Sequence, residues 1–319
     1  MVSSFKLLIK LIWWLLIIYL WYIFVADRIG YEDEHNHGDT IRNELKKPWW
    51  VQKKISSDLD IVIKIIKDAL QSDQWHHTSD TLYSVQHYQA LCKKYQDICT
   101  LIHFQWDPTF TQQTRYLAML VYTIYRMDWY LNTETKLVDV LSRITIDVSN
   151  MGRRWTAGTY SIVFNMGKIK SHKEFLWVIA HELNHTVDLA VLEGTLSQID
   201  HDYTEFGEAH FSIDDPSIDF YKISRNSEKI LKAWAWFRDF VSGYGLTTPF
   251  EDFAEAGNLY LYHYELFYKM SKSNPILARK FAYMQKLYNN KTISKGKKYT
   301  DSQSDPDRRP RDTTKLSNQ

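Results

Sequence analysis

The stretch that most constrains the fold runs from Phe175 to Glu193 and reads FLWVIAHELNHTVDLAVLE. Its apolar residues recur at helical spacing and predict one buried stripe, formed by Leu176, Ile179, Leu183, Val187 and Ala190. His181 and His185 each lie two residues from Leu183, which places them roughly 200° round the helix from it. The sequence therefore predicts a helix with one face in a core and two imidazoles on another face.

The pentapeptide HELNH, His181 to His185, carries the elements of a metal site. Two histidines four residues apart stand one turn apart, so their ring nitrogens can bind one metal ion. Glu182 lies beside them, where a carboxylate can take the proton of a metal-bound water. The alternative is two surface histidines, but an apolar helix is an unusual place for such a pair. The pattern favours a metal-dependent hydrolase.

Composition excludes one class of function. The chain has 319 residues, 45% of them hydrophobic and 24% charged, with a net charge of +1. These values are typical of a folded chain with one sizeable core or two small ones. There is no basic excess to attract phosphate and no nucleic-acid-binding motif, so nucleic acid is not an expected partner.

Residues 7–26 read LLIKLIWWLLIIYLWYIFVA and predict a membrane anchor. About twenty apolar residues at roughly 1.5 Å each cover the hydrocarbon thickness of a bilayer. Lys6 and Lys10 lie at one end and acids dominate after the other, which places the N-terminus in the cytoplasm and the remaining domain outside. A cleaved signal peptide is the alternative, disfavoured by Phe24 three positions before a cut after Ala26.

The rest of the chain divides by composition. Residues 27–50 form a polar linker, 51–290 the folded domain and 291–319 a tail that we expect to be disordered. Helical periodicity covers Ile55–Leu70, Leu82–Ile102, Thr111–Leu131 and a shorter stretch near Lys136–Ile144. ITIDV (144–148) and TYSIVF (159–164) then predict two strands before the HELNH helix. Such a strand can serve the fold alone or offer its free edge to an extended peptide.

Cys92 and Cys99 are the only cysteines, and both fall in the predicted helix Leu82–Ile102. Seven residues along a continuous helix span about 10 Å, which exceeds the reach of a disulfide. A continuous helix therefore predicts two free thiols.

Two histidines rarely hold a catalytic metal alone, so a third ligand is needed. A glycine and a third histidine at three-residue steps are absent, because Asp188 and Val191 occupy those positions. Residues 199–221 contain His201 and His210 but also seven acids and no basic residue. We interpret this segment as a solvated acidic loop, with a calcium site or a selector for cationic substrates as the alternative.

A better source of the ligand is the stretch Ser242–Tyr262. Thr248 as N-cap and Pro249 at the first position predict a helix start, with Glu251 and Glu255 one turn apart near it. Thr248 and Glu251 also match a capping box, in which Glu251 would reach back to the cap and leave Glu255 free to bind metal. The local pattern leaves both glutamates open as the ligand.

HELNHTVD (181–188) and GYGLTTPFEDFAEA (243–256) together resemble the gluzincin-type zincin metallopeptidases, most closely the lethal-factor-like branch. The resemblance implies an α+β fold: a mostly helical zincin-like domain with a small β-sheet beside the active-site helix, here preceded by one transmembrane helix. It also implies zinc (Zn2+) as the cofactor. Asn184 departs from the branch, which commonly has a glycine there.

Carried over position by position, the resemblance assigns a role to six residues. The zinc ligands would be His181, His185 and Glu251, with Glu182 as general base and acid. Glu255 would orient a ligating imidazole, and Tyr244 would donate a hydrogen bond to the developing oxyanion.

We therefore expect a membrane-anchored zinc metallopeptidase that hydrolyses a peptide or protein substrate. The alternative is a catalytically silent zinc-binding module that serves a structural role or binds other proteins. Glu182 favours the enzyme, because binding a metal does not require a base at that position.

Overall fold

The computed structural model describes residues 85–105, 108, 110–149, 155–157, 160–205, 207, 209–296 and 309–318. All of them belong to one compact unit, Lys54–Gln319. The predicted anchor (1–26), linker (27–50) and helix Ile55–Leu70 lie outside these residues. Within the described part, no helix is both long enough and apolar enough to cross a bilayer.

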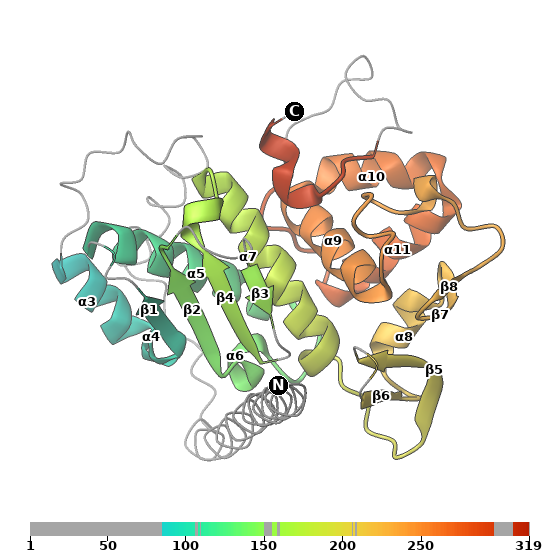
Figure 1. The fold of residues 1–319 in the computed structure, drawn as a ribbon, viewed down its shortest axis with the longest axis horizontal. Helices are drawn as coiled ribbons and strands as arrows, with labels where there is room; N and C mark the ends of the chain where they lie inside the picture. The colour runs from blue at the N-terminus through green and yellow to red at the C-terminus, as the bar shows by residue number, and fades with distance from the viewer. Residues whose placement is uncertain are drawn as a thin grey trace, which may run out of the picture. The chain divides into compact units, whose positions relative to one another are not determined.

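The fold is α+β and mostly helical, as predicted. Its first half contains a four-stranded sheet, and its second half contains helices and two small hairpins (Figure 1). The elements of the first half are α3 (Val85–Lys94), α4 (Gln96–Leu101), β1 (Ile102–Gln105), α5 (Phe110–Tyr130), α6 (Leu137–Val140), β2 (Arg143–Asp147), β3 (Trp155–Ala157), β4 (Ser161–Asn165), η2 (Met166–Lys168), α7 (His172–Thr186) and η3 (Val187–Val191).

The second half continues from η3 to the C-terminal segment. Its elements are β5 (Ile199–Glu205), β6 (Ala209–Ser212), α8 (Pro216–Tyr221), β7 (Arg225–Ser227), β8 (Ile230–Leu231), η4 (Phe237–Asp239), α9 (Pro249–Tyr262), α10 (Tyr264–Ser273), α11 (Pro275–Leu287) and η5 (Thr313–Asn318).

The four-stranded sheet has the order β1-β2-β4-β3. β2 pairs in parallel with β1 and with β4, whereas β3 runs antiparallel to β4 at the edge. β2 and β4 confirm the two predicted strands. β1 was not predicted, because its four residues follow directly on the helical periodicity before them. The predicted helix Lys136–Ile144 is correct only for the single turn of α6, since β2 begins at Arg143.

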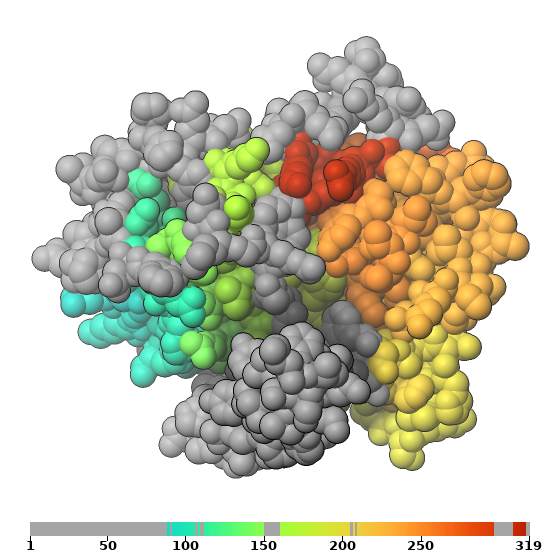
Figure 2. Space-filling model, viewed as in Figure 1, coloured from blue at the N-terminus to red at the C-terminus, as the bar shows by residue number. Residues whose placement is uncertain are grey.

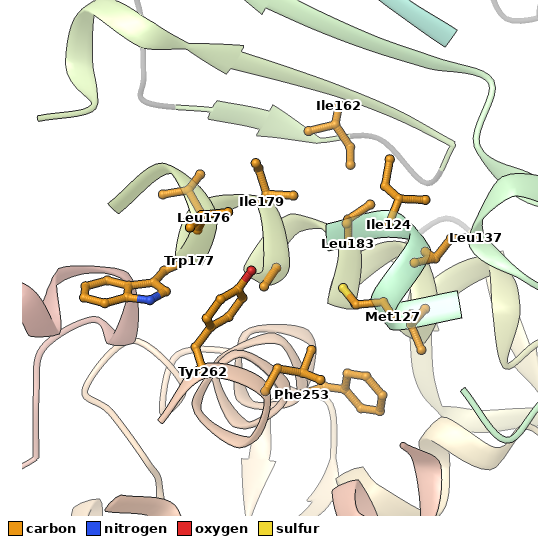
Figure 3. Close-up of a cluster of buried hydrophobic side chains, with 14 of the residues drawn as sticks. Ile124, Met127, Leu137, Ile162, Leu176, Trp177, Ile179, Leu183, Phe253 and Tyr262 are labelled. Atoms are coloured by element: carbon orange, nitrogen blue, oxygen red, sulfur yellow. The ribbon is translucent and has the colours of Figure 1, made fainter. Parts of the chain in front are cut away.

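Helix α7 packs between the sheet and the second half of the domain. Its Phe175 contacts Phe164 of β4 and Tyr116 of α5, with ring centroids 5.5 and 5.6 Å apart. On another side of α7, Figure 3 shows Phe253 and Tyr262 of α9 against the same helix. The predicted apolar stripe is buried. On the face with the histidines His181 is buried too and His185 is partly buried, because α9 covers that face.

The expectation of free thiols is wrong. Cys92 and Cys99 form a disulfide with their Cα atoms 5.4 Å apart. The predicted helix is not continuous: α3 ends at Lys94, and α4 starts after Tyr95, whose backbone leaves the helical conformation. The predicted helix Thr111–Leu131 agrees with α5.

The acidic segment 199–221 is also not the loop we expected. It folds into the β5–β6 hairpin and α8, with Gly207 at the turn in the left-handed region (φ +83°). The buried rings of Tyr203 and Tyr221 lie 5.3 Å apart and tie the hairpin to α8. Aromatic burial therefore orders a segment whose charge alone predicts a solvated loop.

The C-terminal tail is ordered where the structure describes it. Residues 309–318 lie between α7 and the C-terminal helices, and Figure 2 shows them in red between the green and orange atoms. Thr313 and Thr314 are completely buried. The prediction of disorder is therefore wrong for residues 309–318.

Candidate metal centre

The site lies where α7 and α9 cross at close range. A Cβ atom on Gly257 of α9 would overlap the side chain of Asn184 of α7 and lie 2.8 Å from its Nδ2. Asn184 is held in place from both ends: its Nδ2 donates to the Ala180 carbonyl at 2.6 Å, and its Oδ1 accepts from the Tyr288 hydroxyl at 2.6 Å. Because Gly257 has no side chain, the Asn184 side chain fits between the two helices. α9 therefore approaches α7 closely, and its first turn lies beside the histidines.

Three side chains converge at this crossing. Oε2 of Glu251 lies 3.2 Å from Nε2 of His181 and 3.4 Å from Nε2 of His185. His181, His185 and Glu251 each offer one ligand atom, all within 4.8 Å of one another. Among the described residues they form the group that could hold a metal ion.

The spacing of these atoms fits a tetrahedral ion. With metal–ligand bonds of about 2.0–2.1 Å, neighbouring ligand atoms of a tetrahedral site lie roughly 3.3 Å apart. The separations of 3.2 and 3.4 Å between the glutamate oxygen and the two imidazole nitrogens match that edge. The three protein ligands of such a site leave a fourth position open.

The start of α9 agrees with the prediction from the local sequence. Thr248 is the N-cap, and its hydroxyl accepts a hydrogen bond from the Glu251 backbone N–H at 3.1 Å. The Glu251 carboxylate points to the histidines. The geometry thus distinguishes the two glutamates: Glu251 lies at Nε2 of both rings, and Glu255 lies at Nδ1 of His181.

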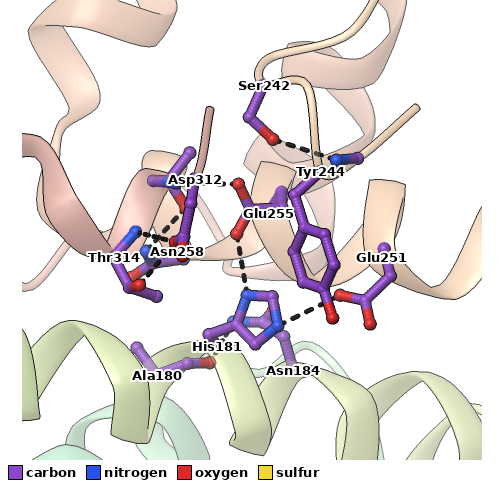
Figure 4. A network of polar contacts seen from close by, with 12 residues as sticks. Ala180, His181, Asn184, Ser242, Tyr244, Glu251, Glu255, Asn258, Asp312 and Thr314 are labelled. Carbon is purple, nitrogen blue, oxygen red and sulfur yellow. Dashed lines mark hydrogen bonds and ion pairs between the residues drawn. The ribbon is translucent and has the colours of Figure 1, made fainter. Parts of the chain in front are cut away.

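Glu255 lies on the opposite edge of the His181 ring from Glu251. Its Oε1 is 3.0 Å from His181 Nδ1, and its Oε2 accepts from the Thr313 backbone N–H at 2.8 Å (Figure 4). Both side chains of the Glu255–His181 pair are fully buried. A carboxylate in this position selects the tautomer that carries a proton on Nδ1 and leaves Nε2 free to bind.

The charges of the cluster favour a cation. Burial lowers the pKa of His181, but hydrogen bonds to Glu251 and Glu255 and the charge of Glu182 outweigh burial and raise this pKa well above its usual value. Burial raises the pKa of Glu251, yet the two histidines outweigh it and hold the pKa of Glu251 well below its usual range. The carboxylates thus stabilise positive charge between them, whether from protons or from a metal ion.

Glu182 and Tyr244 border the same group. Glu182 is only 1% exposed, and its Oε1 lies 3.8 Å from His181 Nε2. The Tyr244 ring stacks on His181 with centroids 6.1 Å apart, and Figure 4 shows its hydroxyl pointing towards the Glu251 carboxylate. Burial and the neighbouring carboxylates raise the pKa of Tyr244, so the phenol keeps its proton at neutral pH and can act as a donor.

The other histidines that the sequence offered lie elsewhere. His201 and His210 face each other on the β5–β6 hairpin, with ring centroids 5.7 Å apart, and are not part of the group. Asp188, which stands where another pattern has a glycine, accepts a hydrogen bond from the Tyr221 hydroxyl at 2.6 Å.

Sequence reasoning missed two contributors to the site. Gly257 was not recognised as the partner of Asn184, although a glycine inside a helix is itself a signal of close approach. Thr313 was placed in a disordered tail. It reaches Glu255 through its backbone N–H, which every residue except proline has, so no sequence signal could have found it.

Comparison with known proteins gives no match: no family model, no curated protein sequence and no solved structure is similar to this chain. The resemblance to zincin metallopeptidases therefore stays an expectation from the two motifs.

Proposed function

We propose that this protein is a zinc-dependent metallopeptidase, with His181, His185 and Glu251 as the zinc ligands. The observation that carries the proposal is the convergence of the two Nε2 atoms on Glu251 Oε2, at 3.2 and 3.4 Å, with Glu182 beside them. Two imidazoles and one carboxylate are a known ligand set of catalytic zinc in hydrolases. The HELNH motif supplies only the two histidines and Glu182, and the distances add Glu251 as the third ligand.

Zinc held by these residues would lower the pKa of a bound water towards about 7 and polarise the scissile carbonyl. Glu182 takes the proton from the attacking water and passes it to the leaving amine. Tyr244 keeps its proton and donates a hydrogen bond to the oxyanion that develops on the carbonyl oxygen. Glu255 holds the His181 ring in the orientation and tautomer that binding through Nε2 requires.

The sheet supports a peptide as the substrate. β3 is one of the two edge strands of the sheet, antiparallel to β4, and α7 packs beside the same sheet. An extended peptide can add to such an edge through main-chain hydrogen bonds. We assign a peptide or protein segment as the substrate, bound in extended form along β3.

We further propose that residues 1–26 anchor the enzyme, with the N-terminus in the cytoplasm and the catalytic domain outside. The Cys92–Cys99 disulfide supports this placement, because disulfides persist mainly in oxidising compartments. Protease added to intact cells should degrade the domain. Protection until the membrane is opened would contradict the orientation.

The competing proposal is a zinc-binding module without turnover, which has the same ligands and needs no base. The two are separated by a peptide-library cleavage assay on the full-length chain. The wild type and the control Glu193→Gln, a change at an exposed glutamate beyond η3, should cleave. Glu182→Gln should bind zinc with wild-type stoichiometry but not cleave. Cleavage by none of the three proteins, with zinc bound, would favour the module.

A further inference from the structure

The described C-terminal segment, Arg309–Asn318, contacts two parts of the metal centre, and both lie far from the segment in the sequence. It lies against the loop that carries Tyr244 and against α9, which carries Glu255. Figure 1 shows it in red beside α7 and α9. Neither the ligand set nor the proposed chemistry assigns it a role.

Its first contact is with the Tyr244 loop. The Gly243 N–H donates to the Pro310 carbonyl at 2.9 Å, and the Tyr244 N–H donates to the Arg311 carbonyl at 2.9 Å. Two consecutive main-chain hydrogen bonds of this kind fix both the position and the direction of a loop. The segment thereby fixes the backbone from which the Tyr244 phenol reaches Glu251.

Its second contact is with Glu255. The Thr313 N–H donates to Glu255 Oε2 at 2.8 Å, and the Thr313 hydroxyl accepts from Asn258 Nδ2 at 2.9 Å. Because the other oxygen of Glu255 lies 3.0 Å from His181 Nδ1, one carboxylate links the C-terminal segment to the histidine.

The segment is held in place by contacts outside the site. Arg309 donates from Nε to the Phe240 carbonyl at 3.0 Å and from Nη2 to the Arg238 carbonyl at 2.8 Å. Asp312 caps η5 by accepting from the Thr314 N–H at 2.8 Å. These bonds do not involve a metal ligand, so the segment can act as a fixed support.

We propose that residues 309–316 are a strap that positions the metal centre, and that the Thr313 N–H is its key group, acting on His181 through Glu255. The inference rests on the proposed metal centre and adds positioning residues to it. An outer hydrogen bond to a ligating histidine typically changes metal affinity or activity about 10–100-fold. Losing the Thr313 N–H leaves Glu255 free to turn away from His181.

The test removes this one donor and little else. Thr313 is the first residue of η5, a position at which proline is readily accommodated because its N–H has no partner within the helix. Thr313→Pro removes the N–H and the hydroxyl. The matched control Thr313→Ala removes the hydroxyl and the γ-methyl group but keeps the N–H. The zinc Kd of each full-length protein is measured by chelator competition, with circular dichroism of the metal-free protein to check the fold.

We expect Thr313→Pro to weaken zinc binding by no more than the loss of Glu255 itself, for which about 10–100-fold is typical, and Thr313→Ala to bind close to wild type. In the Glu255→Ala background, Thr313→Pro should have little further effect, because its action passes through Glu255. If Thr313→Pro does not fold, Arg309→Ala serves instead, with Lys315→Ala as control, and should weaken zinc binding in the same direction.

Three results would overturn the strap. Equal zinc affinity in Thr313→Pro and wild type would show that the N–H does not act on the site. Equal losses in the proline and alanine variants would assign the effect to side-chain packing. A chain ended after residue 308 that cleaves faster than wild type would mean that the segment blocks substrate. A wild type that binds no zinc would instead refute the metal centre itself, and the strap with it.

Discussion

Gly257→Ala should push α9 away from α7 and lower both stability and zinc affinity. The new Cβ would overlap Asn184, which must then give up its hydrogen bonds to the Ala180 carbonyl and the Tyr288 hydroxyl. Each lost bond between groups that stay buried costs about 2 kcal/mol, and alanine regains about 1 kcal/mol through helix propensity. The expected net loss is about 3 kcal/mol.

The assay is urea unfolding of the metal-free full-length chain, followed by zinc affinity of the folded fraction. Asn184→Ala and the double variant complete a mutant cycle. Removing the Asn184 side chain removes the overlap, so the double variant should be more stable than Gly257→Ala alone. Additive effects, or a Gly257→Ala protein that is more stable than wild type, would contradict the close crossing of α7 and α9.

Three further predictions concern the site and its surroundings. On folded protein, Glu251→Ala should lose more zinc affinity than Glu255→Ala, for which the loss should be about 10–100-fold; the reverse order in a zinc titration would exchange their roles. Tyr244→Phe should keep zinc and lower kcat about 10–1000-fold, and unchanged turnover would make Tyr244 a packing residue. Burial lowers the pKa of His263 to about 3, so the stability it contributes is present above its unfolded pKa and is lost as pH falls. Between about pH 7.5 and pH 5, the free energy of unfolding of the metal-free wild type should therefore fall by about 2 kcal/mol more than that of His263→Phe. The same pH dependence of this free energy in both proteins would refute the prediction.

The sequence predicted the helices and strands whose hydrophobic residues recur with a clear period. The helical repeat of α5 and the β-branched runs of β2 and β4 agree with the structure. β1 was missed because Ile102–Gln105 has too few residues to interrupt the preceding helical pattern. The break at Tyr95 was missed for the same reason, and with it the Cys92–Cys99 disulfide.

The site was predictable where chemistry requires particular side chains. HELNH and the paired glutamates of α9 contain the three groups that the structure brings together. What the sequence could not decide was which glutamate faces Nε2, because the same Glu251 also fits a capping box. The distances of Glu251 to both histidines, and of Glu255 to Nδ1, depend on how α7 and α9 pack.

The supports of the site that act through the backbone were not predictable, because almost every residue has the same main-chain groups. The C-terminal segment has a polar sequence that is typical of a disordered tail. It is ordered by main-chain hydrogen bonds to Gly243 and Tyr244 and by the Thr313 N–H. The acidic hairpin is ordered by the buried Tyr203, whose contact with Tyr221 is formed only in the folded chain.

The central claim is one zinc ion held by His181, His185 and Glu251. It is tested most directly by an anomalous difference map recorded at the zinc absorption edge from crystals of the zinc-loaded protein. The account predicts one peak, about 2.0–2.2 Å from Nε2 of each histidine and from a carboxylate oxygen of Glu251. A zinc-loaded crystal with no peak at this position, or with the ion bound through Glu255 in place of Glu251, would contradict it.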